Sequence, residues 1–358
     1  MRSIFVDKIA SVAQHAKLRH ELRVADEIPC DEGVLIAVRV LNNKTRYNQL
    51  ELTSGRMATV NQGDTVVGAL GHRKALFGYS GHLPESLEVG SIVQILNIGG
   101  VLGICDSANP DVGAPFDCEV LGTVLHFPYL GERIGVPARV GAVTLDDTAA
   151  LDTRAVPVVA MAGTCMDSGK TAAACAIVSR LRHLGMHVAA CKATGVSLRR
   201  DILAMEDAGA SETMIFSDFG IVTTTARNGP ALTRALLSAL AEHDPDVIVL
   251  ELGDGLLGAY GVEAILTDET IRRAFSAVVL CASDPVAAWG GARILREQYG
   301  IEPAVVTGPA TDNAVGIQQI ADRLSLPAIN ALTHGVALGD RIAECLPALR
   351  EKARRADS

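Results

Sequence analysis

The stretch that decides the fold of the C-terminal half is Gly163-Thr164-Cys165-Met166-Asp167-Ser168-Gly169-Lys170-Thr171. An apolar, β-branched run, Val156–Met161, comes directly before it, and an alanine-rich stretch that favours a helix, Lys170–Leu184, overlaps its end. A loop that joins a strand to a helix N-terminus presents backbone N–H groups to anions. The stretch therefore predicts a phosphate-binding loop, or P-loop, with Ala172 as the next residue of the same site.

The side chains of this loop predict how a nucleotide would be held. Gly169 lets the backbone approach a phosphate without a Cβ clash, and Lys170 would reach the β- and γ-phosphates. The Thr171 hydroxyl would bind Mg²⁺. We therefore expect a nucleoside triphosphate with Mg²⁺, and we expect ATP while leaving GTP open.

After about residue 150, strand-like runs alternate with stretches of helical length, which is typical of a parallel α/β sheet. The predicted strands are Val156–Met161, His187–Lys192, Asp246–Leu250, Ala277–Ala282 and Pro303–Thr307. The predicted helices are Lys170–Leu184, Ala231–His243 and Ala288–Tyr299. The fold class is thus α/β, a parallel-sheet P-loop NTPase domain over residues 152–358.

The N-terminal part, residues 1–151, predicts a smaller β-rich domain of unknown role. Short apolar runs such as Val34–Val40, Thr65–Gly68 and Ser91–Leu96 are separated by turns, which favours a barrel or a sandwich. The turns at Gly63-Asp64 and Gly99-Gly100 predict hairpins. Ser11–Arg23 predicts a leading helix.

Composition excludes several classes of partner. The formal net charge is −9, and the basic residues are dispersed, so we expect no nucleic-acid partner. The N-terminus lacks the apolar core of a signal peptide, and no apolar run reaches the roughly 18 residues that span a bilayer. The eight cysteines form no C-x-x-C pair, which fits reduced thiols. We expect a cytoplasmic protein without a membrane partner.

The spelling G-T-x-x-x-x-G-K-T resembles the P-loop of dethiobiotin synthetase and of its relatives in cobyrinic and cobyric acid amide synthesis and in molybdopterin-guanine dinucleotide biosynthesis. Cys191-Lys192-Ala193-Thr194-Gly195 is similar to a second segment of that family. The resemblance implies that Lys192 contacts the γ-phosphate and the group being activated, and that Thr194 and Gly195 lie at the same site. A surface lysine is the plainer alternative.

Two acidic residues complete the predicted metal site with Thr171. Asp201 stands where the resemblance implies a magnesium ligand, although an acid in the first turn of a helix is equally common. Glu251 follows the apolar strand Asp246–Leu250, and a buried acid at a strand tip is unfavourable unless it is paired or bound to metal. We therefore expect Thr171, Asp201 and Glu251 to hold Mg²⁺.

The resemblance covers roughly Val156 to Leu332 and implies an ATP-dependent ligase that activates a small carboxylate or carbamate for attack by an amine, with Lys170 and Lys192 as catalytic residues. Two alternatives stay open. One is an ATP- or GTP-hydrolysing switch or accessory protein, such as a cofactor-biosynthesis adaptor or metallochaperone. The other is a small-molecule kinase. The expected partners are a small-molecule substrate and a second copy of the chain in a homodimer.

Overall fold

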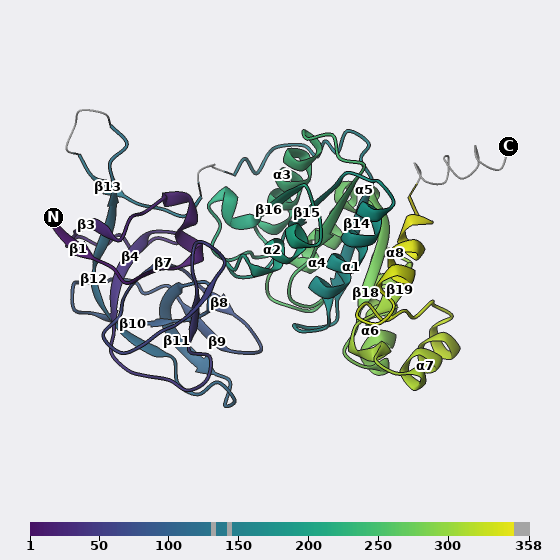
Figure 1. Cartoon of the computed structure of the whole chain (residues 1–358), viewed down its shortest axis with the longest axis horizontal. Helices are drawn as coiled ribbons and strands as arrows, with labels where there is room; N and C mark the ends of the chain where they lie inside the picture. The colour runs from purple at the N-terminus through teal and green to yellow at the C-terminus, as the bar shows by residue number, and fades with distance from the viewer. Residues whose placement is uncertain (130–133, 142–144, 347–358) are drawn as a thin grey trace. The chain divides into compact units, whose positions relative to one another are not determined.

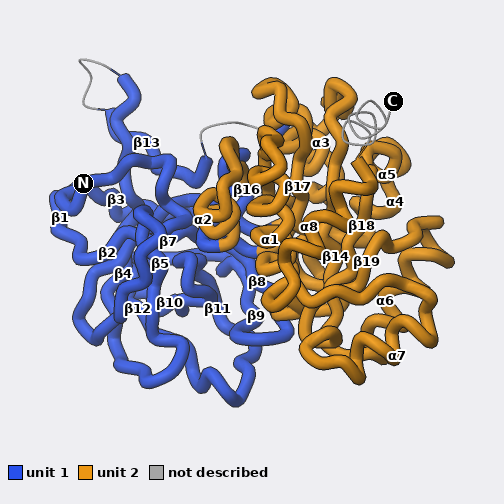
Figure 2. Tube along the Cα trace, turned by 45° about the vertical axis from the view of Figure 1, so that its right-hand side comes forward, with its two compact units in different colours: residues 1–145, 196–200, 216–223 blue, residues 146–195, 201–215, 224–358 orange. Residues whose placement is uncertain are grey.

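The computed structural model describes residues 1–129, 134–141 and 145–346. The chain divides into two compact units, drawn in blue and orange in Figure 2. Unit 1 comprises Met1–Leu145, Val196–Arg200 and Phe216–Thr223. Unit 2 comprises Asp146–Gly195, Asp201–Ile215 and Thr224–Ser358. The division thus falls after Leu145, and two short stretches of the C-terminal half belong to unit 1.

Unit 1 is built almost entirely from short strands (Figure 1). They are β1 (Arg2–Phe5), β2 (Lys8–Ile9), β3 (Glu21–Ala25), β4 (Leu35–Val40), β5 (Gln49–Glu51), β6 (Met57–Thr59), β7 (Thr65–Leu70), β8 (Arg73–Lys74), β9 (Tyr79–His82), β10 (Ile92–Ile95), β11 (Val101–Ala108), β12 (Phe116–His126) and β13 (Val136–Pro137). Two 3₁₀ helices, η1 (Ser11–Ala16) and η2 (Phe216–Phe219), belong to the same unit.

The strand pairing closes a barrel. β12 pairs with β4, β4 with β7, β7 with β11, β11 with β10, and β10 returns to β12. A closed circuit leaves no open edge among these strands, which removes the main aggregation hazard of a sheet. Of the two predicted architectures, barrel and sandwich, the pairing fits the barrel. Val222, from the C-terminal half of the sequence, is fully buried in its core.

Two local predictions in this unit are wrong. Ser11–Arg23 is not one helix, because η1 ends where Lys17 adopts a left-handed φ of 47°. The chain then forms β3, in which buried Leu22 and Val24 alternate with exposed neighbours, a period of two that a helix cannot use. The turn at Gly63-Asp64 joins β6 to β7, strands of different sheets, whereas Gly99-Gly100 does lie in a hairpin, between β10 and β11.

Unit 2 is a six-stranded parallel sheet covered by helices. Its strands are β14 (Val158–Gly163), β15 (Val188–Lys192), β16 (Glu212–Ile215), β17 (Val247–Glu251), β18 (Phe275–Cys281) and β19 (Val305–Thr307). Its helices are α1 (Lys170–His183), α2 (Arg200–Asp207), α3 (Gly229–Ala241), α4 (Val262–Thr267), α5 (Glu269–Ala274), α6 (Pro285–Tyr299), η3 (Pro309–Thr311), α7 (Ala314–Leu324) and α8 (Gly335–Ala343).

The five predicted strands and three predicted helices of this half are confirmed, with shifted ends. Strand β16 was not predicted, because its sequence, Glu-Thr-Met-Ile, has no apolar run. It is an edge strand that pairs only with β15, so it needs less apolar surface than the central strands. Helices α2, α4, α5, α7 and α8 were also not predicted.

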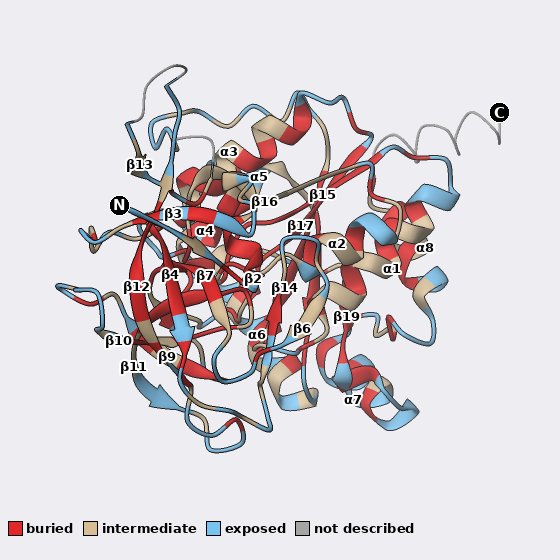
Figure 3. Ribbon diagram, turned by 60° about the vertical axis from the view of Figure 1, so that its left-hand side comes forward, coloured by how far each residue is buried: buried red, intermediate tan, exposed pale blue. Residues whose placement is uncertain are grey.

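Burial on both faces explains why the central strands are so apolar. Every residue of β14, β15 and β17 is buried, and Figure 3 shows these strands in red. Val159 and Met161 of β14 share a core with α1 and α8, whereas α3 packs near β15, β16 and β17. None of the helices in the described part of the chain is long and apolar enough to cross a membrane.

The strand order, β16-β15-β17-β14-β18-β19, brings the predicted site residues to one edge. β17 lies between β15 and β14, and in register Lys192 is opposite Glu251, which is opposite Met161. Because all strands are parallel, the loops that follow them emerge at the same edge of the sheet, where ligands of such folds collect.

Leu181 and Leu184 offer a matched test of the packing of α1. Leu181 is fully buried in the core, while Leu184, at the C-terminus of the same helix, is exposed. We expect Leu181→Ala to lower the free energy of unfolding by about 2–5 kcal/mol, and Leu184→Ala by less than about 0.5 kcal/mol.

The measurement is urea unfolding followed by the fluorescence of Trp289, the single tryptophan, which lies in α6 of unit 2. Equal effects of the two substitutions would contradict the packing described here.

Candidate functional site

The P-loop begins at the end of β14 and runs to the N-terminus of α1. Thr164 N donates to Cys281 O at 2.9 Å, which fixes the start of the loop against β18. Asp167 and Gly169 have left-handed φ values of 57° and 89°, so the loop turns back before the helix begins. Gly169 is the N-cap, and since it has no side chain, the first N–H groups of α1 are left for a ligand.

Lys170 lies over the loop and is nearly buried. Its Nζ donates to Cys165 O at 2.8 Å, so the ammonium lies inside the curve of the loop. A Cβ on Gly163 would stand 2.7 Å from this Nζ and 2.5 Å from Ser168 Oγ. Glycine at position 163 is therefore required for the lysine to fold back in this way.

A hydrogen bond joins Glu251, at the end of β17, to helix α1, which follows the P-loop. Thr171 Oγ1 donates to Glu251 Oε2 at 3.0 Å, although the two residues are 80 positions apart. Glu251 is 2% exposed, and this burial raises the pKa of its carboxyl group. Lys192 and Lys170 oppose that rise, because nearby positive charges favour the ionised form.

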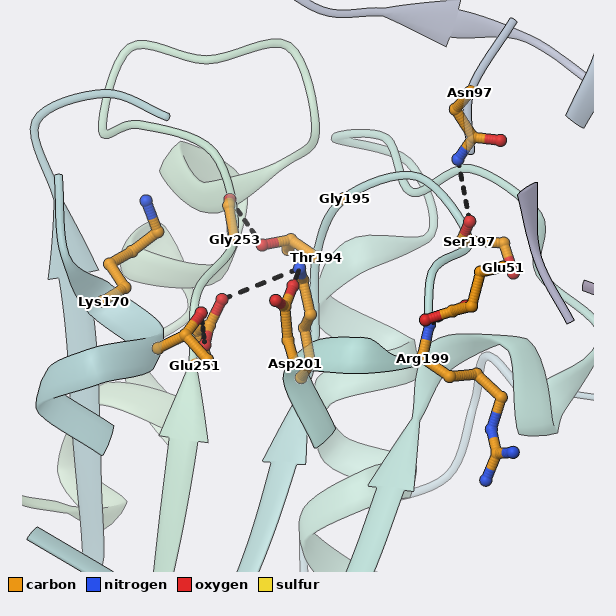
Figure 4. A network of polar contacts seen from close by, with 12 residues as sticks. Glu51, Asn97, Lys170, Thr194, Gly195, Ser197, Arg199, Asp201, Glu251 and Gly253 are labelled. Atoms are coloured by element: carbon orange, nitrogen blue, oxygen red, sulfur yellow. Dashed lines mark hydrogen bonds and ion pairs between the residues drawn. The ribbon is translucent and has the colours of Figure 1, made fainter. Parts of the chain in front are cut away.

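Lys192 lies between two carboxylates. Its Nζ forms a hydrogen-bonded ion pair with Asp201 Oδ2 and lies 3.7 Å from Glu251 Oε1. Both partners and the lysine are buried, with Asp201 in the first turn of α2. Figure 4 shows the carboxylates of Glu251 and Asp201, which both approach Lys192, near one another. Lys192 is therefore not an exposed surface lysine, which was the alternative left open by the sequence.

The oxygen atoms at this edge suit a divalent cation that is shared with phosphate. Thr171 Oγ1 and Glu251 Oε2 are hard donors of the kind Mg²⁺ prefers, and a cation beside Glu251 would favour its ionised form. Asp201 pairs with Lys192, and the same ammonium group lies 3.7 Å from Glu251 Oε1. Among the described residues, no group of three or more His, Cys, Asp or Glu side chains could hold a metal alone. A Mg²⁺ ion that keeps water and phosphate ligands needs only one or two carboxylates.

Thr194 and Gly195 use their polar groups within the protein. Thr194 Oγ1 donates to Gly253 O at 2.9 Å, and Gly195 N donates to Thr224 Oγ1 at 2.8 Å. Gly253 must be a glycine, because a Cβ there would lie 2.2 Å from Thr194 O. The first contact joins the loops after β15 and β17, and the second joins the loop after β15 to the segment before α3. Ligand binding by Thr194 and Gly195 stays a prediction.

The chain between Gly195 and Asp201 is held by buried side chains of unit 1, to which residues 196–200 belong. Asn97 Nδ2 donates to Ser197 O at 2.8 Å, and Glu51 Oε2 accepts from Arg199 N at 2.8 Å. Figure 4 draws both contacts. Sequence reasoning missed Glu51 and Asn97, since neither stands in a motif.

The loop after β19 packs beneath the P-loop. A Cβ on Gly308 would stand 2.2 Å from Ser168 O, so this position tolerates no side chain. Asn313 caps α7 by accepting from Val315 N and Gly316 N, and Asp312 Oδ1 accepts from Asn330. Asn313 and Asp312 therefore bind groups of the protein itself.

Comparisons with known proteins assign no family. No protein-family model matches the chain. No curated protein matches it either. The resemblance to the dethiobiotin synthetase group therefore stays a prediction from the motifs.

Several solved structures resemble part of the chain. Chloroplast FtsY from Physcomitrella patens has a TM-score of 0.39 at 16% identity, covering 58% of this chain and 69% of that one. Hydrogenase maturation factor HypB from Archaeoglobus fulgidus has a TM-score of 0.38 at 16% identity, covering 54% and 91%. Signal recognition particle 54 kDa protein from Aeropyrum pernix, in complex with GDP, has a TM-score of 0.38 at 17% identity, covering 56% of this chain and 49% of that one. Scores at this level assign neither a family nor an activity.

The buried ion pair of Lys192 predicts a stability effect that a surface pair lacks. Asp201→Ala leaves Lys192 with Glu251 as its more distant carboxylate, and we expect the free energy of unfolding to fall by about 3 kcal/mol. Asp340→Ala, which breaks the partly exposed pair with Arg180, should cost less than about 1 kcal/mol.

Urea unfolding of both variants under the same conditions checks this expectation. A smaller loss for Asp201→Ala than for Asp340→Ala would contradict the burial of the Lys192 pair.

Proposed function

We propose that unit 2 binds a nucleoside triphosphate with Mg²⁺ and cleaves the bond to its terminal phosphate. The observation that carries this proposal is the hydrogen bond between Thr171 on the P-loop helix and Glu251 at the tip of β17. It joins a hydroxyl and a carboxylate at the end of a loop built to receive phosphate.

The parts of the site divide the work between them. The backbone N–H groups of residues 165–169 would bind the β-phosphate, and Lys170 would move from Cys165 O to the β- and γ-phosphates. Thr171 and Glu251 would hold Mg²⁺, which when bound neutralises charge on the phosphates. Lys192 would add a second positive charge beside the γ-phosphate.

The charge balance of the site favours hydrolysis over transfer to an anionic acceptor. Lys192 pairs with Asp201 and lies 3.7 Å from Glu251, and the charges of Lys170 and Lys192 act to lower the pKa of Asp254. A carboxylate substrate would bring further negative charge next to these acids, whereas water brings none. We therefore favour a nucleoside triphosphatase whose hydrolysis controls a partner, the switch or accessory role.

Ligase-type activation of a small carboxylate is the second candidate, and Lys192 is the observation that favours it. A buried second lysine beside the P-loop would stabilise an acyl phosphate as it forms. Phosphate release that needs only nucleotide and Mg²⁺ supports hydrolysis, whereas release that requires a carboxylate and an amine supports the ligase. The homodimer and the cytoplasmic location stay predictions.

Lys170→Ala tests nucleotide binding. A ligand at about 100 times its Kd stabilises the native state by about 2.7 kcal/mol, which raises the melting temperature by several degrees. We expect such a rise with ATP or GTP plus Mg²⁺ in the wild type, and its loss in Lys170→Ala. Arg180→Ala, at the other end of α1, is the control that should keep it.

The measurement is a thermal-shift assay with each nucleotide, and the nucleotide that stabilises the wild type identifies the base. Stabilisation that survives in Lys170→Ala, or that is missing from the wild type, would contradict the proposed binding site.

Glu251→Gln tests the cation site. The substitution removes a charged ligand but keeps an acceptor for Thr171, so the fold should persist. We expect phosphate release to fall by more than about 100-fold, since a metal ion supplies several kcal/mol of stabilisation in phosphoryl transfer. Glu302→Gln, which alters an exposed pair with Arg296, should leave the rate unchanged.

Phosphate release is measured over a Mg²⁺ titration, with EDTA as the metal-free reference. A Glu251→Gln variant that matches the wild type at every Mg²⁺ concentration would show that this carboxylate does not hold the cation.

A further inference from the structure

The loop after β17 carries an aspartate in the left-handed conformation that glycine adopts most readily. Asp254 has a φ of 70°, in the left-handed region that favours glycine. Its two neighbours are glycines, Gly253 and Gly255, yet the position between them is not. This conformation is less favourable for a residue with a Cβ than for glycine, so the surroundings hold it there.

The path of this loop is fixed against the P-loop. Leu252 N donates to Met161 O at 3.0 Å, and Leu256 N donates to Gly163 O at 2.8 Å, so both ends of the loop are tied to β14. A Cβ on Gly255 would stand 2.8 Å from Thr164 O. Asp254 is therefore carried on a short, doubly tied loop that packs against the start of the phosphate-binding loop.

The two oxygens of the Asp254 side chain lie in different surroundings. The backbone N–H groups of Gly255 and Ala259 act to lower the pKa of the carboxyl group, and a Cβ on Gly258 would stand only 2.0 Å from Oδ2. Oδ1 is buried and finds no hydrogen-bond partner among the described residues. A buried acceptor without a donor is unfavourable, because it has lost its hydrogen bonds to water.

The charges of the two site lysines act on this carboxylate. Burial raises the pKa of Asp254, and the positive charges of Lys170 and Lys192 act against that rise. These are the two lysines that we place around the γ-phosphate. An acceptor oxygen that is desolvated, unpaired and within the field of both lysines is suited to a donor that arrives with the substrate.

We propose that Asp254 is a catalytic residue whose Oδ1 accepts a hydrogen bond from the water that attacks the γ-phosphate. The proposal rests on the proposed function and deepens it by naming the group that activates the nucleophile. The water oxygen forms a bond to Pγ, and the bond from Pγ to the β–γ bridging oxygen breaks. The nucleoside diphosphate leaves with that electron pair, and the water proton passes to Asp254.

This role separates water from the carboxylate acceptor of a ligase. A carboxylate nucleophile has no proton to donate, and its negative charge would meet that of Asp254. Water, in contrast, can donate to Oδ1 while its oxygen faces Pγ. The strained loop thus supports hydrolysis as the fate of the γ-phosphate.

The test compares Asp254→Asn and Asp254→Gly with Asp244→Asn in the full chain. Asp244 is a matched control, since it is also an aspartate with a left-handed φ, 50°, but it is exposed and precedes β17 instead of following it. Asp254→Gly relieves the backbone strain, so it separates loss of activity from loss of fold.

Two measurements are made on each protein. The first is phosphate release from ATP and from GTP with Mg²⁺. The second is the thermal shift produced by ATP or GTP and by ADP or GDP with aluminium fluoride, a mimic of the phosphoryl group in transfer. We expect both Asp254 variants to keep the triphosphate shift, to release phosphate at least about 100-fold more slowly, and to lose the extra shift with aluminium fluoride. Asp244→Asn should behave as the wild type.

The outcomes distinguish the two levels of the proposal. If the wild type binds and hydrolyses nucleotide and the Asp254 variants do so equally well, the role of Asp254 is wrong while the proposed function stands. If the wild type binds and hydrolyses neither ATP nor GTP, the proposed function fails and the role of Asp254 fails with it. A loss of the triphosphate shift in both variants would make Asp254 a binding or structural residue and overturn the proposal.

Discussion

The carboxylate of Glu251 is the constraint on which the architecture of unit 2 depends. It is nearly inaccessible to solvent at the tip of a fully buried strand, where an unpaired charge would be strongly unfavourable. The structure meets this cost by surrounding it with the Thr171 hydroxyl and the Lys192 ammonium. Each of these partners comes from a different neighbouring element, so the acid can exist only if β14, β15 and β17 keep their order and register.

The topology of the sheet supplies that order at no further cost. In a parallel sheet each strand ends at the same edge, so residues that are distant in sequence meet without any special loop. Main-chain bonds then lock the edge: Ala193 N donates to Glu251 O, and Leu252 N donates to Met161 O. The P-loop, Lys192 and the loop that carries Asp254 are therefore held at this edge of the sheet by backbone as well as by side-chain contacts.

The two halves of the sequence are less separate than their compositions indicate. Lys192 and Asp201 form one ion pair, yet the chain between them includes residues 196–200, which belong to unit 1 and are held there by Asn97 and Glu51. The β-rich unit is thus connected to the site by covalent structure.

The sequence by itself determined the local elements of unit 2. The Gly163–Thr171 motif, the apolar runs and the alanine-rich stretch after Lys170 are local signals, and each became the expected loop, strand or helix. It also identified Lys192, Asp201 and Glu251 as the charged residues to watch. What it could not supply were features without a local pattern, such as the edge strand β16 and the closure of the barrel.

Only the tertiary structure decided which of these residues meet. The Thr171–Glu251 hydrogen bond and the contacts of Lys192 with two acids join residues that are far apart in the chain. The tertiary structure also leaves one buried oxygen of Asp254 without a hydrogen-bond partner among the described residues. The physical reason is that the local sequence around a charged side chain is the same whether that side chain is exposed to water or buried in a polar network. Its role is set by the burial and by the partners that strand order and register bring to it.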